Sequence, residues 1–504
     1  MDSQLTLLAT LTALTLAFGY LLRARSTSSA PPGPPAHPIL GHSLIFPKQL
    51  SWERFHAWSK EYNSDIIQLS MLGTNVVILD TLQATKELLD KRSSSYSSRP
   101  RMPMVTELMG WDFNLGTMPY GSRWRAHRKL FERSFHANAG VLYEPKSLKA
   151  SRELVESLWH EPERFLDHFR HMAGSVILSV TDGIQTQRDN DPFVKLSEAG
   201  IKPVLEAVVP GTYLVDTFPI LKYIPDWMPF ARFKKVAKEA RKASMAMVEL
   251  PFEHAKRTMV EQNVAPSFVS TRLQNMENAA NPEDDEERIK STAATMYSAG
   301  FDNIISTLTG FVLGILENPE AQTKAQKEID SILLSGELPT FDDKESLPYV
   351  TALTMEVFRW AISSPIGAPH MLISDDVYNG YRLKSGSLVF ANIWAILHDE
   401  KTYPDPFKFN PDRFLENGRL NTSNEADMSA FGFGRRICPG RFMGFSTIWI
   451  AVASILATCE ISKAVDEEGN VIDPIVTYNS STSCMPAPFK CSIKPRRRIV
   501  ERSA

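Results

Sequence analysis

The chain is poor in cysteine. Its 504 residues include four, which are Cys438, Cys459, Cys484 and Cys491, and no two of them form a C-x-x-C pair. Because their spacing also gives no regular disulfide framework, a reducing compartment is favoured over an oxidising one.

The chain also lacks an excess of either charge. Its net charge of −3 gives no reason to expect a nucleic-acid partner. We find no internal repeat, no long low-complexity tract and no fingerprint for a flavin or a nicotinamide. What the chain does have is a hydrophobic content of 43%, which supports a large core. Its length alone would suggest about three domains.

Residues 5–22 form an apolar run that is long enough to cross a membrane. As a helix this run would be about 27 Å long at 1.5 Å per residue. Asp2 precedes it, while Arg23 and Arg25 follow directly, so the positive-inside rule places the N-terminus outside and the remaining chain in the cytosol. The alternative is a cleaved signal peptide, which normally has a positive start and a shorter apolar segment. We therefore predict a transmembrane anchor.

A polar linker and a proline-rich stretch at 31–35 follow the anchor. Proline-rich segments are stiff and extended, so residues 23–36 are predicted to set a catalytic body, residues 37–504, at a fixed stance against the bilayer. Residues 66–71 and 76–79, joined across 72–75, are predicted to form a β-hairpin. Helical patterns then dominate up to Glu317.

One cysteine lies in a glycine-rich loop that runs from Phe431 to Gly440. Gly434 and Gly440 are expected to let the backbone fold closely around the sulfur of Cys438. Arg436 offers a charge-assisted hydrogen bond two residues earlier. The alternative is a buried structural cysteine in a Gly/Arg-rich turn. The pattern F-x-x-G-x-R-x-C-x-G resembles the haem-binding loop of the cytochrome P450 family, in which the thiolate binds haem iron and favours O–O cleavage.

Further residues match motifs of the same family in the same order. Trp124 and Arg128 lie four residues apart on a helical pattern and so project from one face; alone they could belong to an ordinary amphipathic helix. The family resemblance implies that this pair, with Arg436 and with His370, binds the haem propionates. A surface position is the alternative for His370.

A second set of charged residues is expected to support the cysteine loop. Glu356 and Arg359 have the E-x-x-R spacing, which in isolation is most often a surface salt bridge of little worth. Arg413, in Pro411-Asp412-Arg413-Phe414, stands at the distance that suits the family's second motif. The resemblance implies a buried network under the haem, since buried charges are tolerated only when paired.

A long helix is predicted over about 285–317, after an acidic, loop-like approach at 281–288. Its middle contains Ala299, Gly300, Asp302 and Asn303, which is similar to the family's oxygen-binding segment A-G-x-D/E-T-T. The first threonine is Asn303 here, and an amide cannot pass on a proton as a hydroxyl can. Our hypothesis is that Asp302, Asn303 and ordered water, together with any substrate hydroxyl, manage proton delivery. The alternative is that oxygen activation is impaired.

Two apolar stretches are candidates for contact with substrate or membrane. Residues 101–119 carry several methionines and aromatics, and family position favours a wall of the substrate pocket over core packing. Residues 211–230 are rich in aromatics and prolines and precede a basic run. Family position suggests that this loop caps the substrate channel and dips into the bilayer, with a buried loop as the alternative.

The chain as a whole is similar to microsomal, fungal-type cytochromes P450. The resemblance implies one mainly α catalytic domain with a small β-rich lobe, anchored in the endoplasmic reticulum with its body in the cytosol. It implies haem b and an NADPH-cytochrome P450 reductase, with cytochrome b5 as a second candidate donor. Lys129, Arg133, Arg435 and Arg441 are candidates for reductase docking.

The expected reaction is monooxygenation of a small, largely apolar molecule, such as a terpenoid, an aromatic secondary metabolite or a xenobiotic. Two alternatives stay open. One is a haem-thiolate enzyme that rearranges or dehydrates an oxygenated substrate, which would need no proton relay. The other is a haem-dependent binder without turnover.

Overall fold

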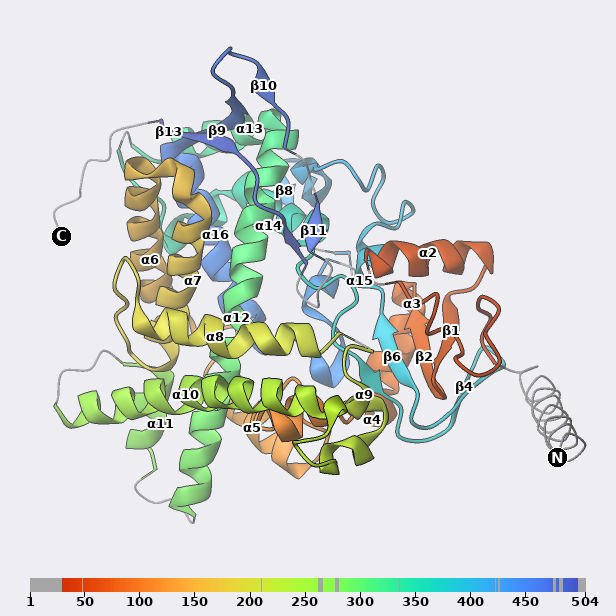
Figure 1. Cartoon of the computed structure of the whole chain (residues 1–504). Helices are drawn as coiled ribbons and strands as arrows, with labels where there is room; N and C mark the ends of the chain where they lie inside the picture. Colours follow the sequence, from red (N-terminus) through yellow and green to blue (C-terminus); the bar gives the residue numbers. More distant parts are fainter. Residues whose placement is uncertain are drawn as a thin grey trace, which may run out of the picture.

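Helices make up most of the computed structural model (Figure 1). The structure describes residues 30–47, 49–209, 211–261, 266–276, 281–334, 336–421, 423–424, 427–474, 477–479 and 484–496. The longer helices are α2 (Ser51–Glu61), α5 (Ser122–Glu132), α6 (Gly140–His160), α7 (Phe165–Thr181), α8 (Pro192–Ala207), α10 (Arg232–Val260), α12 (Pro282–Glu317), α13 (Pro319–Ile332), α14 (Pro348–Trp360) and α16 (Arg441–Thr458). The shorter ones are α3 (Leu82–Thr85), α4 (Ser93–Tyr96), α9 (Leu214–Thr217), α11 (Phe268–Gln274) and α15 (Ile393–Leu397).

The strands form small separate sheets. A four-stranded sheet has the order β1-β2-β6-β3, and a three-stranded sheet has the order β10-β9-β13. Two-stranded pairs complete the set. The bounds are β1 (Ile66–Met71), β2 (Thr74–Leu79), β3 (His370–Met371), β4 (Asp376–Tyr378), β5 (Tyr381–Leu383), β6 (Leu388–Ala391), β7 (Leu415–Glu416), β8 (Arg419–Leu420), β9 (Cys459–Val465), β10 (Val471–Ile472), β11 (Tyr478–Asn479), β12 (Met485–Pro486) and β13 (Cys491–Pro495). The expected class, mainly α with a small β-rich lobe, is confirmed.

The predicted hairpin is present, with β2 two residues longer at its start than expected. Strands β1 and β2 pair in antiparallel register from Ile66 opposite Leu79 to Met71 opposite Thr74. The two residues between them, Leu72 and Gly73, both have positive φ angles of 47° and 94°. Such a two-residue turn matches the right-handed twist of the strands that it joins.

Helix α12 runs through the middle of the helical part and contacts α7, α14, α16 and α10 (Figure 1). It begins at Pro282, so the stretch that we expected to be a loop-like approach is already helical. Glu283, Asp284 and Asp285 occupy its first turn, where negative charge suits the helix dipole. Helices α12 and α16 are apolar and long enough to cross a membrane, but both are mostly buried inside the fold, as core helices are.

The proline-rich stretch lies against the β-rich lobe. The amide of Gln68 in β1 donates to the carbonyl of Pro32 over 2.9 Å. A Cβ on Gly33 would lie 2.3 Å from the carbonyl oxygen of Gln68, so only glycine fits this approach. These contacts fix residues 32 and 33 against the body, while the stance of the body against a bilayer stays a prediction. The predicted anchor at 5–22 lies outside the described residues.

Candidate functional site

Most of the predicted site residues meet at one cavity of about 370 Å³. Helices α5 and α12, the loop after α14 and the loop before α16 supply its walls. The predicted residues that line it are Trp124, Arg128, Ala299, Gly300, Asn303, His370, Phe431, Arg436, Cys438 and Gly440. Asp302 and Gly434 do not line it.

The loop that holds Cys438 is tightly folded. The backbone amide of Cys438 donates to the carbonyl of Phe431 over 2.8 Å, and this hydrogen bond closes the loop. Gly434 has a φ angle of 57°, and a Cβ there would lie 2.0 Å from the carbonyl oxygen of Leu89. Burial raises the pKa of the Cys438 thiol, while the Gly440 amide and the nearby guanidinium of Arg128 lower it.

Gly434 and Gly440 have different roles in this loop. The close approach expected at Gly434 is confirmed. The same expectation for Gly440 is wrong on steric grounds, because its φ is −88° and the nearest atom to an added Cβ is in the Phe131 ring at 3.8 Å. Gly440 instead acts through its amide, which faces the Cys438 sulfur.

This difference gives a matched pair of variants. We expect Gly434→Ala to destabilise the chain by about 1–3 kcal/mol or more, the usual cost of a strained backbone position, and to lower haem retention. Gly440→Ala adds the same methyl group where the protein has room, so its unfolding midpoint should stay close to that of the parent. Urea unfolding of the two variants measures both effects. Equal destabilisation would show that the contact with Leu89 does not matter.

Buried guanidiniums gather at one edge of the cavity. Arg436 donates to the carbonyls of Ser97, Leu115 and Met118 over 2.7, 3.0 and 2.7 Å. Burial, reinforced by repulsion from Arg99 and Arg128, lowers the pKa of Arg436 to about 8. A cation in this position is short of negative partners.

Two aromatic and cationic neighbours strengthen this edge. Arg128 donates to the carbonyl of Ile437 over 2.6 Å and to Glu132 over 2.7 Å, so the pair predicted on α5 reaches the cysteine loop directly. Both Trp124 and Arg128 are buried, so the alternative of an ordinary helix with an exposed arginine is wrong. The Trp124 indole Nε1 is buried without a hydrogen-bond partner among the described residues. Buried polar groups are normally paired, so this donor indicates a missing acceptor.

Sequence reasoning missed Arg99. This residue is buried, lines the cavity, and donates to the carbonyls of Gly116, Ala368 and Pro369 over 2.7–2.9 Å. Burial lowers the pKa of Arg99 to about 10. No spacing in the sequence points to it, because the partners are carbonyls from two distant loops. Its position beside Arg436 makes it part of the same anion-binding edge.

His370 is buried in β3, so the surface alternative is wrong. Its Nδ1 lies 2.8 Å from the carbonyl oxygen of Tyr96, which can only accept, so Nδ1 carries the proton. Burial and the charge of Arg99 hold the pKa of His370 well below its usual range. With no anion nearby the ring is neutral, and a bound carboxylate would favour its charged form.

The opposite wall of the cavity belongs to α12. An added Cβ on Gly300 would lie 2.6 Å from the terminal methyl group of Ile177, so that side chain would have to shift. Asn303 faces the cavity and its Nδ2 donates back to the carbonyl of Ala299 over 2.7 Å. Asp302 points away from the cavity lining. Burial raises the pKa of the Asp302 carboxyl, as does the charge of Glu198.

The predicted support network is buried as expected. Arg359 donates to both oxygens of Glu356 over 2.6 and 2.8 Å, and Arg413 contacts the same carboxylate at 3.3 Å. The side chains of Glu356 and Arg359 are 0% and 1% exposed. The surface salt bridge considered for this pair is therefore wrong.

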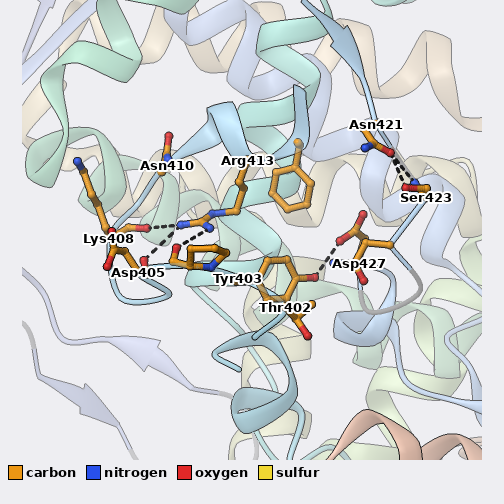
Figure 2. Close-up of a pocket in the computed structure, with 12 residues that line it drawn as sticks. Thr402, Tyr403, Asp405, Lys408, Asn410, Arg413, Asn421, Ser423 and Asp427 are labelled. Carbon is orange, nitrogen blue, oxygen red and sulfur yellow. Dashed lines mark hydrogen bonds between the residues drawn. The ribbon is translucent and has the colours of Figure 1, made fainter. Parts of the chain in front are cut away.

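Arg413 also organises the loop outside this network. Its guanidinium donates to the carbonyls of Pro404, Asp405 and Lys408 beside the Tyr403 ring (Figure 2). The surrounding hollow has a volume of about 460 Å³. Arg413 thus links the loop at 404–408 to Glu356 on α14.

The apolar segment at 101–119 does not form the pocket wall that we expected. Its methionines and aromatics are largely buried in the core and do not line the cavity. Only Asn114, Leu115 and Gly116 of this segment do so. The wall is built by the polar end of the segment, because the apolar end packs under α10, where the Trp111 indole donates to Ser244.

The aromatic loop at 211–230 is exposed, so the buried alternative is wrong. Trp227 and Phe230 are 82% and 83% exposed, and Tyr223 and Ile220 are also exposed. Of the predicted docking cations, Arg435 belongs to the cysteine loop and Arg441 follows it directly. Lys129 and Arg133 are exposed, whereas Arg435 donates to the Tyr120 hydroxyl and Arg441 to the carbonyl of Cys438.

Comparison with known proteins agrees with this geometry. The family model described as cytochrome P450 matches residues 31–483. A cytochrome P450 monooxygenase of Armillaria gallica is 43% identical over 94% of this chain and 93% of its own length. The monooxygenase ple1 of Rhodocybe pseudopiperita is 42% identical over 99% and 96%. A tryptamine 4-monooxygenase of Psilocybe cyanescens is 39% identical over 94% and 95%.

Proposed function

Because the chain belongs to the cytochrome P450 family, whose monooxygenases bind haem b through a cysteine thiolate, we propose that Cys438 is the axial ligand and that the 370 Å³ cavity holds the haem. The observation that carries this proposal is the cysteine loop facing α12 across a cavity edged by buried guanidiniums. Among the described residues, Cys438 is also the only cysteine that lines the cavity.

The residues at the cavity edge fit the two propionates of haem. Arg99, Arg128 and Arg436 supply buried positive charge, and the unpartnered Trp124 Nε1 supplies a donor. Guanidiniums bind carboxylates through charge-assisted hydrogen bonds. The buried ring of His370 lines the same cavity and completes the group. The bound haem supplies the redox chemistry, and these residues hold its orientation.

The side of the cavity toward α12, across the haem from Cys438, would meet the substrate, and its lining suits a small, largely apolar and uncharged molecule. Ile177, Met296, Ile304 and Ile366 are among its lining residues, and no Asp or Glu of the described residues lines it. A cationic substrate would therefore meet no opposite charge. We place a terpenoid, an aromatic secondary metabolite or a xenobiotic in this class.

The test of function is reconstitution with an NADPH-cytochrome P450 reductase and a panel of apolar compounds. We expect product, identified by mass, that requires NADPH, reductase and O₂. Turnover without reductase would instead select the rearrangement or dehydration of an oxygenated substrate. Ligand-induced spectral shifts without any turnover would contradict both.

We expect electrons to arrive on the cysteine side, where Lys129 and Arg133 are exposed. Charged encounter surfaces steer association and are screened by salt. Reductase-driven turnover should therefore slow as ionic strength rises, and Lys129→Glu combined with Arg133→Glu should slow it about tenfold at low salt. Lys327→Glu, on α13, is the control. Unchanged turnover in the double variant would exclude this docking face. Cytochrome b5 is a second candidate for the same face.

The exposed aromatic loop supports a membrane position in the endoplasmic reticulum. Aromatic side chains with nearby cations, here Trp227 and Phe230 beside Lys235 and Lys238, suit the interface between water and lipid. With the single-pass anchor predicted at 5–22, the catalytic body would lie in the cytosol with this loop against the bilayer. Alkaline carbonate extraction of microsomes should leave the full chain in the membrane. Release into the supernatant would contradict the anchor.

A further inference from the structure

The side chain of Asn303 is oriented by the helix that carries it. Its amide nitrogen lies 2.7 Å from the carbonyl oxygen of Ala299, one turn earlier on α12. A carbonyl oxygen can only accept, so the nitrogen and not the oxygen of the amide must face Ala299. The Oδ1 atom of Asn303 is left without a hydrogen-bond partner among the described residues, on a side chain that is exposed to the cavity.

The other polar side chains of α12 at the cavity are already committed. The Thr307 hydroxyl donates to the carbonyl of Asn303 over 2.7 Å, and the Thr295 hydroxyl donates to the carbonyl of Ser291 over 2.9 Å. Both threonines are buried. Asp302, the nearest carboxylate on α12, does not line the cavity. On this wall the open hydrogen-bonding groups are thus the Oδ1 acceptor of Asn303 and the second N–H of its Nδ2, in a lining that is otherwise largely apolar.

We propose that Asn303 Oδ1 is a specificity-determining acceptor, which binds an uncharged hydroxyl or N–H group on the substrate. The substrate is then an apolar skeleton that already carries such a donor, not a bare hydrocarbon. For a hydroxyl, the reaction that supplies the substrate must be one that installs oxygen on that skeleton. This proposal rests on the function proposed above and narrows its substrate class.

The expected change in affinity follows from the loss of one hydrogen bond to Asn303 Oδ1. A site that is built to accept a hydrogen bond discriminates against an analogue that leaves the acceptor unpaired. A net hydrogen bond corresponds to a change of roughly three- to tenfold in affinity. An isosteric probe pair isolates it: 1-adamantanol and 1-methyladamantane differ in a hydroxyl against a methyl group of similar size.

The experiment measures the dissociation constants of both probes by optical titration of the haem-loaded full chain. We expect the ratio of the two constants to shift toward 1-methyladamantane by about tenfold in Asn303→Leu, which keeps the branched shape of the side chain and removes the acceptor. Asn303→Ala is the second variant, in case the leucine is not accommodated, and should shift the ratio in the same direction. Ile304→Val, at the next lining position, should weaken both probes alike and leave the ratio unchanged.

The outcomes separate this inference from the function on which it rests. If the parent chain takes up haem with the carbon monoxide difference band of a thiolate complex, but the probe ratio is the same in the parent and in both Asn303 variants, the acceptor role is wrong and the proposed function stands. Failure of the parent to bind 1-adamantanol also counts against the acceptor role. If the parent shows no thiolate-haem band, the proposed function itself fails.

Discussion

Replacing Cys438 by serine is expected to abolish the thiolate-haem absorption band and to lower product formation by at least about a thousandfold, which corresponds to about 4 kcal/mol in the activation barrier. The reason is electronic, since a serine hydroxyl lacks the electron donation by which a thiolate favours O–O cleavage. The carbon monoxide difference spectrum and the yield of product per NADPH measure the two effects.

A matched control is available because the chain has other buried cysteines. Cys459, at the start of β9, is buried and does not line the cavity. Cys459→Ser should therefore keep the thiolate band, even if the added polarity lowers stability. A normal band in Cys438→Ser, or its loss in Cys459→Ser instead, would show that the ligand has been assigned to the wrong cysteine.

Glu356→Gln is expected to lower the free energy of unfolding by about 3–5 kcal/mol, the range for removing one partner of a buried ion pair. The glutamate is the shared anion of two guanidiniums, those of Arg359 and Arg413, so its neutralisation leaves uncompensated positive charge in a buried place. Urea unfolding followed by haem absorbance reports stability and haem retention together.

The control for this variant is Glu320→Gln on α13. Glu320 is exposed and forms no ion pair with a described residue, so the expected change is within about 0.5 kcal/mol. A change of less than about 1 kcal/mol in Glu356→Gln would mean that carbonyl partners alone hold the two guanidiniums, and the network would lose its assigned role.

Local spacing was sufficient to predict the parts of the site that depend on a single element. Trp124 and Arg128 share a face because they lie four residues apart on α5, and Glu356 meets Arg359 because they lie three residues apart on α14. The tight turn at Gly434 was also visible, since glycine marks positions that side chains cannot occupy.

Other features depended on tertiary contacts and could not be predicted. Arg99 enters the site because two loops bring their carbonyls to it. Asp302 and Asn303 are neighbours in sequence, yet about 100° of helical rotation sends one toward Glu198 and the other into the cavity. A segment rich in methionine, such as 101–119, can belong to the core or to a pocket wall, and only its packing in the folded chain distinguishes these two positions.

If Arg99, Arg128 and Arg436 bind the haem propionates as we propose, the cofactor is also a ligand that stabilises the folded state. Without an anion, three guanidiniums repel one another in a buried edge, and this repulsion acts against the folded chain. A ligand that binds only the folded state stabilises it by about 2.7 kcal/mol at a free concentration one hundred times its dissociation constant. The amount of folded enzyme in a cell is then coupled to its haem supply, so that protein left without haem is removed by quality control and does not accumulate as an inactive pool.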